Sequence, residues 1–222
     1  MNASVDEFEA QLAHSFADAS LLKQALTHRS FSKNHNETLE FIGDAALGLA
    51  IATDLRKRFP SACEGELSRL RAMLVKGETL AEIARENGIG DCLIMGDGEL
   101  ANGGRERKSI LADALEAIIG AVHTDGGFQA AESLVLAWFA QRLAHIKLDD
   151  SKDAKTRLQE LLQAKHTALP EYAVDKTEGE QHQQLFFVSC AANGKQCSGT
   201  GASRRKAEQD AAQNMLQLLG MS

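Results

Sequence analysis

This 222-residue sequence has no long apolar segment, only two prolines, and no cysteines spaced as in a zinc site. No apolar run approaches the ~20 residues that span a bilayer, and the acidic, polar first residues lack the pattern of a secretory signal. The four cysteines form no Cys-x-x-Cys pair and have no histidine at zinc-site spacing. We therefore expect reduced thiols, no structural zinc, no membrane partner and a cytoplasmic location.

The composition is that of a globular protein with a buried core, at 44% hydrophobic and 25% charged residues. The net charge of −7 by itself argues against nonspecific nucleic-acid binding, but the charge is unevenly distributed. Residues 1–150 carry 15 Lys and Arg against 23 Asp and Glu, whereas residues 151–222 carry 9 against 8. The C-terminal part can still bind phosphate, because its cations cluster in SRRKAE at 203–208.

Hydrophobic residues recur with a helical period from residue 5 to about 148, and short polar loops interrupt them. Only two prolines occur in the chain, so little in the sequence interrupts helices. The pattern predicts an all-α domain over 1–148 with roughly seven to nine helices. The Gly-rich stretch 88–98 lacks the Lys-Ser/Thr ending or helix opening of a phosphate-binding loop, so we interpret it as turns.

A charged linker at 149–153 separates this domain from a second one at 154–222. The second domain begins with a helical segment and continues with alternating segments rich in β-formers. Asn-Gly at 193–194 predicts a type I′ hairpin turn between two of these strands. The last helix is expected to begin at Ser203 and end at Gly220. The order α-β-β-β-α predicts a small α+β domain.

A predicted helix over 37–52 carries three carboxylates among residues that otherwise favour burial. Glu37, Glu40 and Asp44 fall within roughly 60° of one another on one helix face. Like charges so close destabilise a helix, and a bound cation such as a metal would offset this; a solvated acidic face is the alternative. The opposite face is expected to form a core stripe of Leu39, Ile42, Ala46, Leu49 and Ala50.

A second apolar helix, predicted over 109–127, contains Asp113 and Glu116 three residues apart. Carboxylates are the ligands that Mg²⁺ and Mn²⁺ prefer, and two helices that each offer a pair can hold one or two such ions. Two divalent ions side by side clamp the attacking and leaving oxygens in phosphodiester hydrolysis. Exposed acids without a ligand are the alternative for each pair, although both pairs interrupt helices rich in Ala and Gly.

The segment ETLEFIGDAAL (37–47) resembles the signature helix of bacterial ribonuclease III. ALTHRSF (25–31), EGELSRLRA (64–72) and SILADALEAIIGAV (109–122) are similar to its flanking segments in the same order, and 154–222 resembles a double-stranded-RNA-binding domain. The resemblance covers nearly the whole chain. It implies a Mg²⁺-dependent endoribonuclease, with Mn²⁺ as a substitute, that cuts both strands of duplex RNA. The expected products carry 5′-phosphate and 3′-hydroxyl ends with short 3′ overhangs.

The resemblance also implies roles for the individual acidic residues. Glu37 and Glu64 match positions that line the cleft and support the site; a helix-start acid and a turn residue are the respective alternatives. Asp44 and Glu116 match the catalytic positions. The implied metal ligands are Glu40, Asp44, Asp113 and Glu116.

Phe41 lies about 40° from Glu37 on the helical wheel, on the acidic rather than the apolar side. A phenylalanine in this position is expected to be shielded from water by another part of the protein or by a partner. The resemblance implies a homodimer whose subunits meet beside this helix, with Phe41 at the contact.

Duplex RNA is recognised through phosphates and 2′-hydroxyls rather than base edges. Basic residues in the first turn of the last helix suit phosphates, although a solvated basic turn is the alternative. The resemblance extends the expected contacts to the first helix and to a strand loop of the same domain. The predicted RNA-binding residues are Thr156, Gln159, Glu160, His182, Ser203, Arg204, Arg205 and Lys206.

Two other functions compete with the nuclease. A dimeric regulator that holds duplex RNA without cutting it is the alternative, and the complete ligand set argues against it. A phosphohydrolase with a small-molecule substrate would leave the second domain without a purpose. The family implies ribosomal RNA precursors, and some messenger and transfer RNA precursors, as the substrates.

Overall fold

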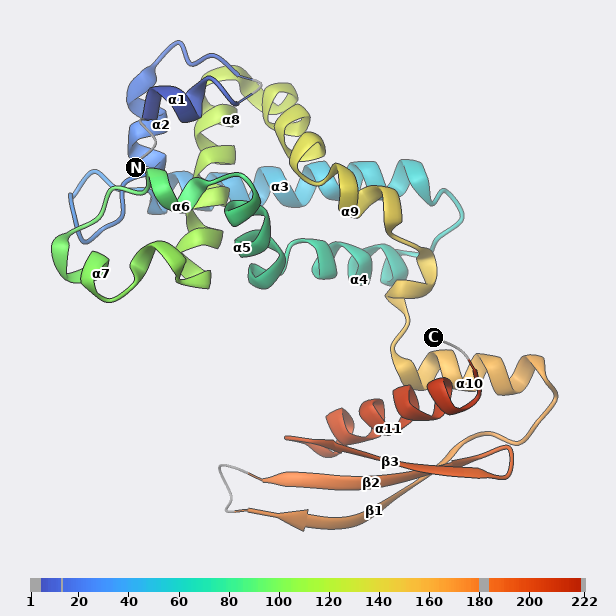
Figure 1. Ribbon diagram of the computed structural model, residues 1–222. Helices are drawn as coiled ribbons and strands as arrows, with labels where there is room; N and C mark the ends of the chain where they lie inside the picture. The colour runs from blue at the N-terminus through green and yellow to red at the C-terminus, as the bar shows by residue number, and fades with distance from the viewer. Residues whose placement is uncertain (1–4, 13, 180–183, 221–222) are drawn as a thin grey trace. The chain divides into compact units, whose positions relative to one another are not determined.

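The computed structural model describes residues 5–12, 14–179 and 184–220. The chain divides into two compact units, Met1–Leu148 and Asp149–Ser222. The first unit is helical, and the second has a helix, three antiparallel strands and a helix (Figure 1). The predicted fold class is confirmed. No helix in the described part of the chain combines the length and apolar character needed to cross a membrane.

The described part of the first unit contains nine α-helices, within the predicted range. The interpretation of 88–98 as turns was wrong in part, because residues 89–92 form the short helix α6. Gly88, with φ +68°, lets the chain turn sharply just before this helix. Ile89 and Cys92 of α6 are buried, and this burial stabilises a single helical turn. The elements are α1 Val5–Glu9, α2 Ala19–Ala25, α3 Glu37–Arg58, α4 Glu64–Leu74, α5 Gly77–Glu86, α6 Ile89–Cys92, α7 Asp97–Ala101, the 3₁₀ turn η1 Gly104–Glu106, α8 Lys108–Trp138 and α9 Ala140–His145.

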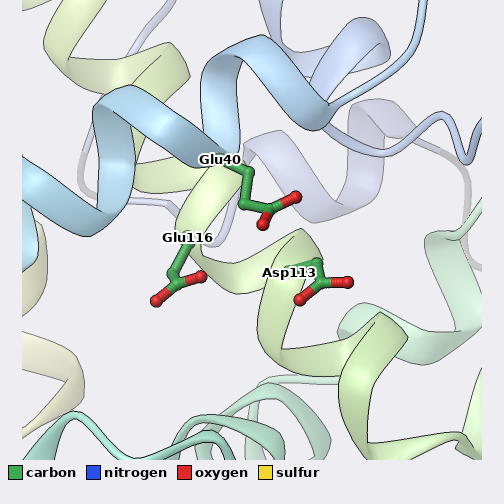
Figure 2. Close-up of side chains that lie close together, drawn as sticks. All are labelled: Glu40, Asp113 and Glu116. Atoms are coloured by element: carbon green, nitrogen blue, oxygen red, sulfur yellow. The ribbon is translucent and has the colours of Figure 1, made fainter.

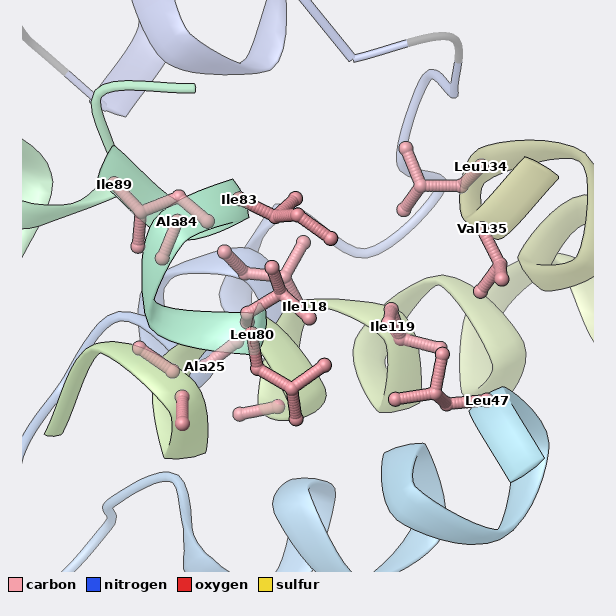
Figure 3. Packing of buried hydrophobic residues seen from close by; sticks show 14 of the residues in the cluster. Ala25, Leu47, Leu80, Ile83, Ala84, Ile89, Ile118, Ile119, Leu134 and Val135 are labelled. Carbon is pink, nitrogen blue, oxygen red and sulfur yellow. The ribbon is translucent and has the colours of Figure 1, made fainter. Parts of the chain in front are cut away.

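Helix α8 is the centre of this unit. One continuous core surrounds it, with α3, α5 and the shorter helices packed against it. Figure 3 shows Leu47 of α3, Leu80 and Ile83 of α5, and Ile118 and Ile119 of α8 in this core. All five side chains are buried. Most of the apolar residues of α8 are therefore covered by other helices, as its Ala- and Ile-rich sequence requires.

The expected apolar stripe of α3 is partly correct. Leu39, Ala46 and Ala50 are buried and Ile42 is half-buried, but Leu49 is 55% exposed. The buried residues of α3 also include Gly43, Leu47, Ile51 and Leu55, so the buried side is displaced around the helix from the expected stripe. Leu49 lies outside the buried side.

The second unit places two helices on one face of a sheet with strand order β1-β2-β3 (Figure 1). Val188 and Cys190 of β2 face these helices and are buried with Leu158, Ala211 and Met215. The elements are the 3₁₀ turn η2 Leu148–Ser151, α10 Ala154–Ala164, β1 Glu171–Glu178, β2 Leu185–Ala192, β3 Lys195–Gly201 and α11 Arg204–Leu218.

The predicted turn and caps of the second unit are present. Asn193 and Gly194 have φ of +50° and +72°, as a type I′ turn requires, and they join β2 to β3. Ser203 caps α11, because its side chain accepts a hydrogen bond from the amide of Lys206. Gly220, with φ +80°, lies just past the end of α11. The local sequence therefore determines where these elements begin and end.

Candidate active site

The crossing of α3 and α8 positions the acidic side chains. A Cβ added to Gly43 of α3 would overlap the backbone carbonyl of Glu116, and a Cβ added to Gly120 of α8 would overlap the carbonyl of Leu39. The two backbones therefore touch at a pair of glycines. Glu40 lies one turn before Gly43, and Glu116 lies about one turn before Gly120. Both carboxylates consequently project beside the crossing.

Three of the predicted ligands meet at this point. Figure 2 shows Glu40 from α3 and Asp113 and Glu116 from α8 converging on a common space. One oxygen from each carboxylate can be chosen so that all three lie within 4.8 Å of one another. All three side chains are half-buried. Carboxylate oxygens gathered in this way are the ligands that hard divalent cations prefer.

The carboxylates raise one another's pKa values. Burial, followed by the charges of Asp44, Glu40 and Asp113, raises the pKa of Glu116 to about 8. Burial and the neighbouring charges of Asp113, Glu37 and Asp44 also raise the pKa of Glu40. A divalent cation would compensate both the repulsion and the lost hydration, so the donor set fits a hard, oxygen-binding ion such as Mg²⁺.

The pKa of Asp113 is affected by charges of both signs. Burial raises it and the charge of Glu37 adds to the rise, whereas His28 and Arg29 lower it. The net direction is upward. Positive side chains therefore lie near one end of the acidic group.

Asp44, the fourth predicted ligand, is exposed and lies one turn after Glu40 on α3. It is not a member of the close group of three, although its charge contributes to the raised pKa of Glu116. Glu37 is also exposed, and its Oε1 lies 3.4 Å from Nη1 of Arg29. The structure thus gathers the five acids that the sequence singled out on α3 and α8 in one region, with three in close proximity.

Glu64 lies apart from this group. It is the first residue of α4 and accepts a hydrogen bond of 2.6 Å from the hydroxyl of Ser68. It lines a separate hollow of about 290 Å³ together with Arg56 and Arg71. Within the single chain, the structure does not bring Glu64 to the other predicted acids.

A cavity of about 810 Å³ adjoins the acidic group. Its acidic lining residues are Glu37, Glu40, Glu99 and Asp113. Glu116 and Asp44 do not line it, so the cavity and the carboxylate group overlap only in part. The cationic lining residues are Arg29 and Arg107, and the imidazole of His28 lines the same cavity. Sequence reasoning did not assign a role to these three, although His28 and Arg29 belong to the segment at 25–31 that resembles the family.

Phe41 is 80% exposed, the most exposed of the large apolar side chains that the structure describes. The acidic helix therefore presents an aromatic ring to its surroundings, as the wheel position predicted.

The basic side chains in the first turn of α11 differ in whether they already have a partner within the chain. Arg204 donates a hydrogen bond of 2.8 Å from Nε to Glu208, whereas Arg205 and Lys206 are exposed and form no ion pair in the part of the chain that the structure describes. Ser203 is engaged as the helix cap. Arg205 and Lys206 are thus the cations best placed to contact an anion.

The predicted contacts on α10 also differ from one another. Thr156 and Gln159 are exposed, and the amide of Thr156 is bound by the cap residue Asp153. Glu160 is held by Lys152 through an ion pair of 2.6 Å. His182 lies outside the described residues.

Comparison with known proteins defines the class of the chain. Residues 18–143 match the model of the family described as Ribonuclease-III-like, and residues 154–219 match the double-stranded RNA binding motif. The molecule is therefore a helical nuclease unit followed by a double-stranded-RNA-binding unit.

Similar full-length proteins agree with this class. The chain is 51% identical over 222 residues to Ribonuclease 3 of Vibrio campbellii, covering 99% of both chains. It is 53% identical over 219 residues to Ribonuclease 3 of Psychromonas ingrahamii, covering 98% of this chain and 96% of the relative. The chain therefore belongs to the ribonuclease III family of metal-dependent, double-stranded-RNA-specific endoribonucleases.

A solved structure matches the first unit. The nuclease domain of ribonuclease III from Campylobacter jejuni is 45% identical, with a TM-score of 0.60. The match covers 62% of this chain and 96% of that domain. The helical unit accordingly has the fold of a ribonuclease III nuclease domain.

Proposed function

We propose that the chain hydrolyses phosphodiester bonds of duplex RNA with Mg²⁺, or Mn²⁺ as a substitute, held by Glu40, Asp44, Asp113 and Glu116. The observation that carries this proposal is the convergence of three half-buried carboxylates at the α3–α8 crossing. Their raised pKa values indicate that the uncompensated site is destabilised by negative charge. A bound divalent ion neutralises this charge, polarises the phosphoryl oxygens and lowers the pKa of water.

The side chains of this site have separable roles. Glu116 has the most strongly raised pKa of the group, so it would give up a proton on holding a divalent ion near neutral pH. Asp44 adds a carboxylate at the exposed edge, where the substrate enters, and we assign it and Glu116 as the catalytic residues. Glu37 lines the cavity beside the ligands, and its Oε1 lies 3.4 Å from Nη1 of the exposed Arg29. The supporting role of Glu64 stays a prediction.

We infer a homodimer in which Phe41 packs against the second subunit. Its 80% exposure supports this, because an isolated chain leaves the ring in water. The related nuclease domain from Campylobacter jejuni is described as having a region involved in dimer formation. Two sites related by a two-fold axis suit antiparallel strands, so each site cuts one strand. The products then carry 5′-phosphate and 3′-hydroxyl ends with short 3′ overhangs.

We assign the nuclease to 1–148, the linker to 149–153 and the RNA-binding domain to 154–222. Ribosomal RNA precursors, with some messenger and transfer RNA precursors, are the proposed substrates, because folded precursors supply the duplex that the second unit recognises. A regulator that only binds RNA would have no need for the converging carboxylates. The acidic site therefore favours the nuclease over this alternative.

The variant Glu116→Gln tests the assignment. It keeps the shape of the side chain but removes one ligand charge, so cleavage with Mg²⁺ is expected to fall to background while gel shifts show unchanged binding of the same duplex. Glu132→Gln is the matched control, because Glu132 lies on α8 outside the acidic group. Cleavage by Glu116→Gln at a rate near that of the parent chain would refute the metal assignment.

A further inference from the structure

One wall of the cavity beside the acidic group is anchored by hydrogen bonds to a neighbouring loop. His28, Arg29 and Ser30 line it from the segment between α2 and α3. The amide of His28 donates a hydrogen bond of 2.8 Å to the carbonyl of Ile94, and the hydroxyl of Ser30 accepts one of 3.0 Å from the amide of Gly96. These hydrogen bonds attach the segment to the chain between α6 and α7, so they hold the backbone from which its side chains project.

The ring of His28 is oriented by Ser30. The amide of Ser30 donates to Nδ1 over 3.2 Å, and the Ser30 hydroxyl lies 2.8 Å from the same nitrogen. Because Nδ1 accepts the amide hydrogen, the neutral ring carries its proton on Nε2. Among the described residues, Nε2 has no hydrogen-bond partner. His28 thus offers a donor at the wall of the cavity.

Arg29 is the least engaged of the cavity's arginines. Its side chain is 72% exposed, and its ion pair with Glu37 is long, at 3.4 Å. Arg107, by contrast, lies 2.6 Å from Glu99. An anion entering the cavity therefore meets Arg29 as its available guanidinium, with the donor of His28 on the adjacent residue.

We propose that Arg29 and His28 form a subsite for a backbone phosphate of the RNA strand, next to the phosphate that is cleaved. This inference rests on the proposed function, since it uses the same cavity and the same substrate. Five carboxylates repel the strand, and an ion bound among them compensates only the phosphate that reacts. A neighbouring phosphate needs its own positive partner, and a guanidinium with an adjacent N–H donor provides it.

The first experiment compares Arg29→Ala with Lys33→Ala in the full-length chain. Lys33 is an exposed cation of the same loop and does not line the cavity, so it is the matched control. Loss of a charged hydrogen bond at a partly solvated site predicts a fall of about tenfold in kcat/KM on a short duplex. Lys33→Ala is expected to cut at the parental rate. Equal rates for the parent and Arg29→Ala would overturn the subsite.

The second experiment asks whether a phosphate is the partner. Duplexes with one neutral methylphosphonate linkage, placed in turn on each side of the cut, are cleaved by the parent chain and by Arg29→Ala. At one of these positions the parent is expected to lose about tenfold in rate, and Arg29→Ala to lose nothing further. Equal losses for both proteins at every position would overturn the proposal. Failure of the parent to cut the unmodified duplex would instead refute the proposed function.

Discussion

Gly43 of α3 and Gly120 of α8 form the backbone contact on which the acidic site depends. Each lacks a side chain where a carbonyl of the other helix lies. The carboxylates of Glu40 and Glu116 can meet only because the helices approach this closely. The geometry of the site thus depends on two glycines that have no functional side chain.

Replacing Gly43 with alanine is expected to separate the helices. The added methyl group overlaps the carbonyl of Glu116, so overpacking should reduce the free energy of unfolding by about 1–3 kcal/mol. The carboxylates should also move apart and cleavage should need more Mg²⁺. Urea unfolding and a Mg²⁺ titration of cleavage measure both effects. Gly77→Ala, with open space at its Cβ in the first turn of α5, is the control; it should not lower the free energy of unfolding and should leave the Mg²⁺ requirement unchanged.

The metal-free protein should lose stability as the pH rises through the range in which Glu116 stays protonated. The ordinary pKa of a glutamate in an unfolded chain is 4.5, whereas folded Glu116 holds its proton up to a pKa of about 8. Between these values the folded state binds more protons, so stability falls with increasing pH. Glu116→Gln does not titrate and should exceed the parent by on the order of 1 kcal/mol at pH 8.

Thermal unfolding in EDTA at pH 5 and pH 8 checks this prediction. The difference between Glu116→Gln and the parent should be small at pH 5 and larger at pH 8. An equal difference at both pH values would mean that Glu116 is not the titrating group.

Binding of Mg²⁺ should release protons near neutral pH. Because the pKa of Glu116 is about 8, the side chain is mostly protonated at pH 7 and must lose its proton to become a ligand. Calorimetric titration in two buffers of different ionisation enthalpy measures the number released. Proton release that persists unchanged in Glu116→Gln would assign it to another group.

Removal of residues 149–222 should leave a folded nuclease that cuts duplex RNA only at low salt. The first unit has its own continuous core, and the acidic site lies entirely within it. The truncation removes binding energy, which is mainly electrostatic and falls with salt, but no ligand. Cleavage assays over a range of KCl concentrations test this. Absence of activity even at the lowest salt would show that the second unit contributes to the chemistry.

Within the basic turn of α11, Arg205 and Lys206 should contribute more to RNA binding than Arg204. Arg204 lies 2.8 Å from Glu208, a carboxylate that it shares with Lys155, whereas Arg205 and Lys206 are exposed and form no ion pair among the described residues. Each phosphate contact that is lost should flatten the plot of log K against log salt by about 1. Gel shifts of Arg205→Ala, Lys206→Ala and Arg204→Ala measure the slopes. A larger change for Arg204→Ala would reverse the assignment.

The helical period was sufficient to predict much of this protein from its sequence. It placed Glu37, Glu40 and Asp44 on one face of a helix and put Phe41 on the same side, because the rise and twist of a helix are set by local backbone geometry. Turn and cap residues located the hairpin at 193–194 for the same local reason. Neither inference required knowledge of distant contacts.

Tertiary structure decided which of these residues meet. The crossing at Gly43 and Gly120 joins Glu40 to Asp113 and Glu116, which lie more than 70 residues further along the chain, and leaves Asp44 at the edge. The packing of α3 also buries Leu47 and Ile51, which the expected stripe did not include, and leaves Leu49 exposed.

Loop positions were equally beyond local reasoning. Glu64 lines a different hollow, whereas His28 and Arg29 reach the acidic cavity through hydrogen bonds to the chain between α6 and α7. Periodicity determines the face on which a side chain lies. Which segment packs against that face depends on close packing between parts of the chain that are distant in sequence, and this packing exists only in the folded chain.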